Sequence, residues 1–157
     1  MTARIAALRL VVAAVAGGLT ADPAAACPPQ VTVEHPAASA ADSSFVLVHA
    51  SPGCQRGLLT VTGTAEGLVG GQRRSIRLDV VPTDAEGVYR VRRQWPSRGV
   101  WVLRFVASVG ADHAVALVGV SAAGEIVTVR QQDPARRIYP VITDADVERM
   151  LRSLAAG

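Results

Sequence analysis

The chain has 157 residues, half of them hydrophobic, with 16 basic and 13 acidic residues and a formal net charge of +3. This length fits one domain with a single ordinary core. The small charge excess is far from the strongly basic pattern of nucleic-acid-binding proteins, so no nucleic-acid partner is expected.

Residues 1–26 are typical of an export signal. Arg4 and Arg9 precede an apolar run at 10–19, which is too short to cross a bilayer as a helix. Three alanines at 24–26 then supply the small residues that signal peptidase requires, so Cys27 becomes the first mature residue. The pattern predicts a periplasmic or secreted protein with no second membrane span.

The two cysteines, Cys27 and Cys54, both remain after this cleavage. An even cysteine count in an exported chain favours a disulfide between them. The alternative is lipidation of Cys27, which would make the protein a membrane-anchored lipoprotein. Lipoprotein signals prefer leucine where this chain has Ala24, so the disulfide is the favoured prediction.

The mature chain divides into three parts. Residues 27–44 form an N-terminal edge segment, in which Val31 and Val33 suggest a short strand. Residues 45–132 form the main domain, and residues 133–157 form a linker and a helix. Apolar alternation and turn residues predict strands at 45–50, 58–64, 72–81, 88–95, 100–107, 112–121 and 125–131.

Three of these segments carry further expectations. The run at 112–121 is almost continuously apolar, which favours burial on both faces. The strands at 88–95 and 100–107 flank a Pro-Ser-Arg-Gly turn and are expected to form a hairpin whose aromatic residues point inward. The helix is predicted over 143–155, with Thr143 as its cap and Asp146 at its third position.

The pattern as a whole predicts an all-β fold. About seven or eight short strands with turns every 8–12 residues, followed by one short C-terminal helix, indicate an immunoglobulin-like antiparallel β-sandwich. A small closed barrel is the rival architecture. The pattern does not suit a parallel α/β fold, because no helical period lies between the strands.

The motifs G-V-Y at 87–89 and G-V-W-V-L at 99–103 resemble a hairpin of small exported bacterial β-sandwich proteins. These include FixH-like and YtkA-like domains and, more distantly, CopC-like copper-resistance proteins. Residues 63–69, 72–75 and 93–96 also resemble a group of uncharacterised exported proteins of Gram-negative bacteria, and the resemblance spans roughly 57–130. It implies a β-sandwich but no specific function. Unlike the copper-resistance proteins, the mature chain starts Cys-Pro-Pro and has Met150 as its single methionine.

Several arginines fall on the polar faces of three consecutive predicted strands. If these strands pair in order, they form one basic stripe that could bind an envelope protein or an anionic surface. The ordinary alternative is a solvated sheet face with cross-strand ion pairs. The residues of the stripe are Arg73, Arg77, Arg90, Arg92 and Arg104, with Arg98 in a turn.

The rest of the sequence offers few candidates for metal-binding or catalytic residues. The three histidines, His35, His49 and His113, show no metal-binding spacing; a site using His49 and His113 is an alternative because imidazole suits copper or zinc. Ser51 and Ser121 lack the surroundings of a nucleophile, so no catalytic residue and no cofactor are predicted. The sequence therefore predicts an exported, non-catalytic binding or accessory module of the bacterial envelope. A periplasmic copper-handling protein is the alternative.

Overall fold

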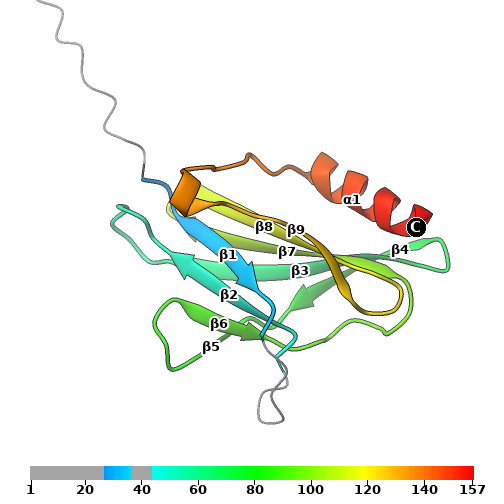
Figure 1. Cartoon of the computed structure of the whole chain (residues 1–157). Coiled ribbons are helices and arrows are strands. Elements are labelled where there is room, and N and C mark those ends of the chain that lie inside the picture. Colours follow the sequence, from blue (N-terminus) through cyan, green and yellow to red (C-terminus); the bar gives the residue numbers. More distant parts are fainter. Residues whose placement is uncertain (1–26, 37–43) are drawn as a thin grey trace, which may run out of the picture.

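The computed structural model describes residues 27–36 and 44–157, and the predicted export signal at 1–26 lies outside the described residues. Two antiparallel sheets pack face to face as a sandwich, and one helix lies on the outer side of the larger sheet (Figure 1). The all-β sandwich with a C-terminal helix is thus confirmed. Within the described part of the chain, no helix is long and apolar enough to cross a membrane.

The smaller sheet has four strands in the order β1-β2-β6-β5. Its strands are β1 (Gln30–Glu34), β2 (Val46–Ser51), β5 (Val81–Pro82) and β6 (Val88–Val91). The short strand expected around Val31 and Val33 is confirmed as β1, an edge strand paired with β2.

The larger sheet has five strands in the order β4-β3-β7-β8-β9. Its strands are β3 (Thr60–Val69), β4 (Gln72–Leu78), β7 (Val100–Val109), β8 (Asp112–Val120) and β9 (Ile126–Arg130). After β9 the chain forms a single 3₁₀ turn, η1 (Pro134–Arg136), and then the helix α1 (Asp144–Ala156).

The main core lies between the two sheets. Alternate residues of β2, such as Val46 and Val48, face Trp101, Leu103 and Phe105 of β7, and all five side chains are fully buried. The period of two in these strands places every second side chain on the inner face.

A second core lies on the outer face of the five-stranded sheet. Val147 and Leu151 of α1 pack there against Val102 of β7 and Leu117 of β8. Strand β8 is therefore covered on both faces from Ala114 to its end, which confirms the expectation from its continuous apolar run.

The predicted hairpin at 88–95 and 100–107 is wrong. Strand β6 ends at Val91 and belongs to the four-stranded sheet, whereas β7 pairs with β3 and β8 in the other sheet. The intervening residues cross from one sheet to the other, and among them Trp95 is buried and packs edge-on against Phe45, with ring centroids 5.0 Å apart.

The predicted strand at 72–81 is also interrupted. Strand β4 ends at Leu78, and the chain then passes to the other sheet, where Val81 and Pro82 pair with β6 as β5. The helix prediction is confirmed: α1 follows Thr143, whose backbone N–H and hydroxyl both donate to the Asp146 carboxylate.

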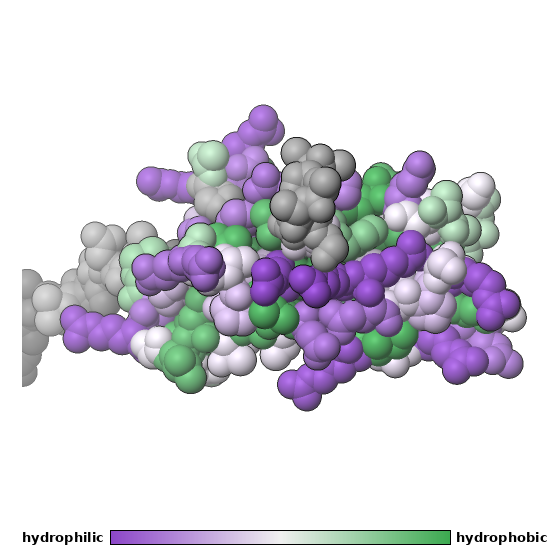
Figure 2. Space-filling view, turned by 90° about the horizontal axis from the view of Figure 1, so that it is seen from below, coloured by the Kyte–Doolittle hydropathy of each residue, from purple (hydrophilic) through white to green (hydrophobic). Residues whose placement is uncertain are grey.

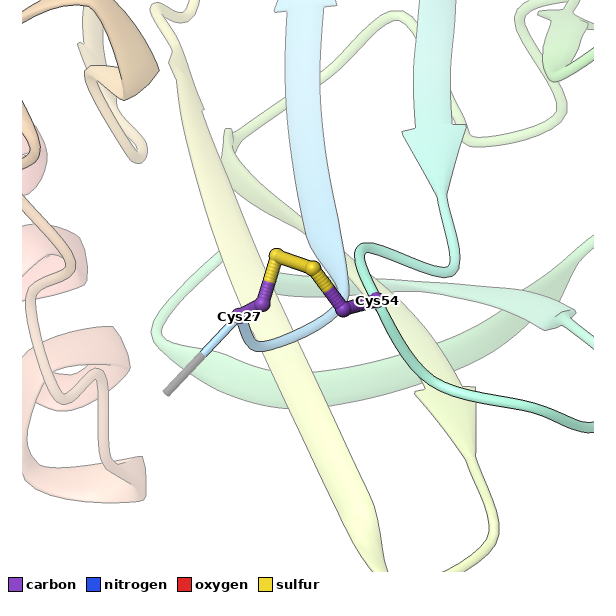
Figure 3. The surroundings of a disulfide bond; sticks show 2 residues. All are labelled: Cys27 and Cys54. Carbon is purple, nitrogen blue, oxygen red and sulfur yellow. A yellow bond between two sulfur atoms is a disulfide. The ribbon is translucent and has the colours of Figure 1, made fainter. Parts of the chain in front are cut away.

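The predicted disulfide between Cys27 and Cys54 is confirmed (Figure 3). It ties the segment before β1 to the loop after β2, and the Cys54 N–H also donates to the Cys27 carbonyl at 3.2 Å. Gly53 makes this approach possible, because it has φ +64° and a Cβ there would collide with the carbonyls of Cys27 and Pro28.

A candidate binding groove between α1 and the β9 edge

The structure divides the predicted arginine stripe between two sheets. Arg73 and Arg77 lie on β4 and Arg104 on β7, whereas Arg90 lies on β6 and Arg92 directly follows it. The stripe required the strands to pair in chain order, and β6 belongs to the other sheet. One continuous basic face is therefore not formed.

Two of these arginines already have acidic partners on α1. Arg104 Nη1 lies 2.6 Å from Asp144 Oδ1, and Arg73 Nη1 lies 2.7 Å from Glu148 Oε1. Arg73 also contacts Glu66 on β3 at 3.2 Å. Most of the stripe arginines that lie on the five-stranded sheet thus pair with acidic side chains of the same chain.

Arg90 and Arg92 lie on the side of the smaller sheet. Hydrophilic residues dominate the coloured surface in the view from that side, and apolar residues appear in small, separate areas (Figure 2). Both arginines are exposed, and with Asp79, Val81 and Gln94 they border a shallow hollow of about 220 Å³.

The histidines considered as metal ligands do not come together. His49 lies on β2, 3.1 Å from Glu34 of β1, whereas His113 lies on β8 in the opposite sheet. Both cysteines are consumed by the disulfide. Among the residues described, no group of three or more His, Cys, Asp or Glu side chains is placed to hold a metal ion.

A groove of about 640 Å³ lies between α1 and β9. Helix α1 packs mainly on β7, β8 and β3, so the outer side of β9 is left partly open. Gly119 of β8 lies beneath this region, and a Cβ at that position would meet Thr128, Met150 and Leu154. The groove has apolar and polar walls, formed by Ser121, Val127, Thr128, Arg130, Asp146, Arg149, Met150, Ser153, Leu154 and Gly157.

Asp146 organises the charged end of the groove. Its Oδ2 accepts hydrogen bonds from Thr143, and its Oδ1 lies 2.6 Å from Nη1 of both Arg130 and Arg149. Hydrogen bonds from the Thr143 backbone and hydroxyl, followed by the hydrogen bond from Arg149 and the positive charge of Arg130, hold the pKa of Asp146 well below its usual range. Two guanidinium groups share one carboxylate, so this end carries an excess positive charge.

Strand β9 offers an open apolar edge beside the groove. Val127 and Val129 are 54% and 43% exposed. The bulge opposite Gly119 and Val120 leaves Val127 without a cross-strand partner, and Val127 lines the groove, whereas Val129 pairs with Val118 and does not line it. An unpaired edge strand presents a row of free backbone donors and acceptors.

The other three sheet edges are protected. On β1, the Val31 N–H donates to the Gln132 side chain at 2.8 Å and the Val33 N–H to the Gln131 side chain at 2.6 Å. Strand β4 exposes three arginines, and β5 is two residues long and contains Pro82, which has no N–H. Of the sheet edges described, β9 is therefore the one best suited to pair with another strand.

Sequence reasoning did not find this groove. It assigned no site to Arg130 or Arg149. The spacing of Asp146 and Arg149, three apart on a helix, indicates an ion pair, but the contribution of Arg130 depends on the packing of α1 over the sheet.

Comparisons of this chain with models of known protein families, with curated proteins and with solved structures give no match.

Proposed function

We propose that the protein is an exported, non-catalytic binding module of the bacterial envelope and that it binds its partner at the groove between β9 and α1. The observation that carries this proposal is the open apolar edge of β9 beside a groove with a positively charged end. The volume of the groove, about 640 Å³, lies within the range of about 300–1,000 Å³ typical of ligand sites.

The disulfide and the N-terminal sequence support export. A disulfide persists in oxidising compartments such as the periplasm, and residues 1–26 have the pattern of a cleaved signal. Because Cys27 is bonded to Cys54, Cys27 has no free thiol to which a lipid could be attached. This favours a periplasmic or secreted form over a lipoprotein.

The chemistry of the groove supports binding rather than catalysis. Asp146 is the acidic side chain that lines it, and this carboxylate already accepts bonds from Thr143, Arg130 and Arg149. Its lowered pKa keeps it ionised at neutral pH, so it is a poor general acid or base.

The strand order supports an immunoglobulin-like relationship. The order β1-β2-β6-β5 corresponds to the A-B-E-D sheet of that fold, and β4-β3-β7-β8 corresponds to C′-C-F-G, with β9 as an added edge strand. Such sandwiches serve many functions, so the proposal rests on the groove and not on the fold.

Site-specific photocross-linking in the native cells tests the proposal. Benzoylphenylalanine is placed at Val127 beside the groove, and at Arg77 or Arg90 on the surfaces of the former stripe. We expect a discrete adduct from Val127 that is lost when Ser153→Arg fills the groove. The matched variant Ser97→Arg, in an exposed turn, should keep the adduct.

Two outcomes would contradict the proposal. Adducts from Arg77 or Arg90 alone would assign binding to the arginine surfaces instead of the groove. The absence of an adduct at all three positions would argue against a binding module.

A further inference from the structure

We infer that the ligand of the groove is an extended peptide segment that pairs with β9 as an additional strand and carries an acidic residue two positions from an apolar one. This inference rests on the proposed function and specifies the class of partner. Three features of the site support the inference: the β9 edge, the apolar wall of the groove and the excess positive charge at one end of the groove.

The β9 edge supplies backbone recognition. Its five residues carry no charge before Arg130 and include no proline. A peptide laid along such an edge forms main-chain hydrogen bonds without regard to sequence, as in known cases of strand addition. Because the edges of β1, β4 and β5 are protected, an added strand is directed to β9.

The apolar wall supplies one side-chain pocket. Met150 and Leu154 of α1 face Val127 of β9 across the groove, and Gly119 beneath them leaves room for their approach. Alternate side chains of an added strand point to the same face of the sheet. One apolar side chain of the peptide can therefore enter between β9 and the helix.

The charged end supplies the second determinant. Arg130 and Arg149 each use Nη1 on the same oxygen of Asp146, and their side chains remain 41% and 66% exposed. Their remaining N–H groups can donate to a second carboxylate, and charged donors prefer such an acceptor. Arg130 and Arg149 line the same groove as Met150 and Leu154, so the acidic and apolar sites open onto one space.

A library of random eight-residue peptides, screened against the purified residues 27–157 with the disulfide intact, tests this inference. We expect enrichment of Asp or Glu two positions from Leu, Ile, Val, Met or Phe. In ¹⁵N NMR spectra, an enriched peptide should shift the amides of residues 126–130 and 146–154, and N-methylation of its alternate amides should abolish binding.

Matched variants locate the acidic determinant. Arg149→Gln should lower the affinity for the enriched peptide about three- to fivefold. It should also reduce the preference of the protein for this peptide over a control peptide with lysine in place of the acidic residue. Arg152→Gln removes an exposed arginine of the same helix that does not line the groove, and should leave the affinity unchanged.

The possible failures are distinguishable. If Val127 forms the groove-dependent adduct in cells but the library yields no acidic–apolar motif, or N-methylated peptides bind equally well, the inference is wrong and the proposed function stands. Concentration-dependent dimers that Ser153→Arg leaves intact and that a charge at Val129 disrupts would show that a second copy, and not a peptide, pairs with the β9 edge, and would also overturn the inference.

Discussion

Gly67 and Trp101 illustrate how single residues set the packing of the sandwich. They are direct cross-strand partners on β3 and β7, and the indole ring covers the space that a side chain at position 67 would occupy. Trp101 is fully buried, and its Nε1 donates to the Arg98 carbonyl at 3.0 Å, so the ring has little freedom to move away.

We therefore expect Gly67→Ala to lower the free energy of unfolding by about 1–3 kcal/mol, the usual cost of overpacking a core. Urea denaturation followed by tryptophan fluorescence measures the change. Thr62→Ala, at an exposed position of the same strand, serves as the control and should have a much smaller effect. Equal stability of the two variants would show that the indole can relocate.

The lowered pKa of Asp146 leads us to expect a specific dependence of the free energy of unfolding on pH in the acid range. Its pKa is lowered in the folded protein, so the unfolded chain binds its proton more readily below the ordinary aspartate pKa of about 3.9. Its contribution to stability is therefore complete above about pH 5 and declines as the pH falls toward and below 3. Denaturation midpoints of Asp146→Asn should show a shallower loss in this range than those of the unmodified protein. Asp84→Asn, in an exposed turn, is the control, and a profile of Asp146→Asn parallel to the unmodified protein would contradict the assignment.

At the scale of elements, the first strand depends on side chains from the end of the larger sheet. The Gln132 side chain accepts from the Val31 N–H and donates to the Pro29 carbonyl, and it is buried. These bonds fill the edge of β1 in place of a neighbouring strand.

Gln132→Ala should lower the free energy of unfolding by about 1–3 kcal/mol, because it leaves a buried backbone donor without a partner. Hydrogen exchange should also accelerate at the Val31 amide. Gln132→Glu keeps the acceptor and should protect this amide more than alanine does, whereas Gln72→Ala, at an exposed position of β4, should change neither property. Unchanged exchange at Val31 in Gln132→Ala would show that the bond is not needed.

Local sequence patterns predicted the positions of the strands and the helix better than they predicted which strands pair. The two-sided burial of β8, the helix α1 and the inward-pointing aromatic residues of β7 followed from periodicity, which depends on neighbouring residues alone. Alternation does not specify the sheet to which a strand belongs, so the predicted hairpin was wrong and the arginines of the predicted stripe are divided between two sheets.

The candidate groove could not be predicted for a related reason. It exists because α1 packs over β7, β8 and β3 and leaves β9 exposed, which brings Arg130 and Arg149 to one carboxylate. The disulfide was accessible to sequence reasoning because two cysteines allow a single intramolecular pairing.

At the scale of the whole molecule, the Cys27–Cys54 bond cross-links the segment before β1 to the loop after β2, across a sequence separation of 27 residues. Cross-linking a loop of this size restricts the unfolded chain and contributes about 3–4 kcal/mol in the chain-entropy view. The double variant Cys27→Ser with Cys54→Ser should lose about this amount in urea denaturation. Reduction of the unmodified protein should have the same effect, and a loss below about 1 kcal/mol would indicate that the segment is held mainly by β1.

The hydrogen bonds from β1 to Gln131 and Gln132 also constrain the order in which the structure can form during synthesis. Gln131 and Gln132 lie 98 and 101 residues after the amides that they bind. During synthesis from the N-terminus, the edge of β1 therefore stays open until most of the chain has emerged, although β2 is available early to pair with its other side. Until these two glutamines are in place, β1 presents backbone groups with which another strand can pair.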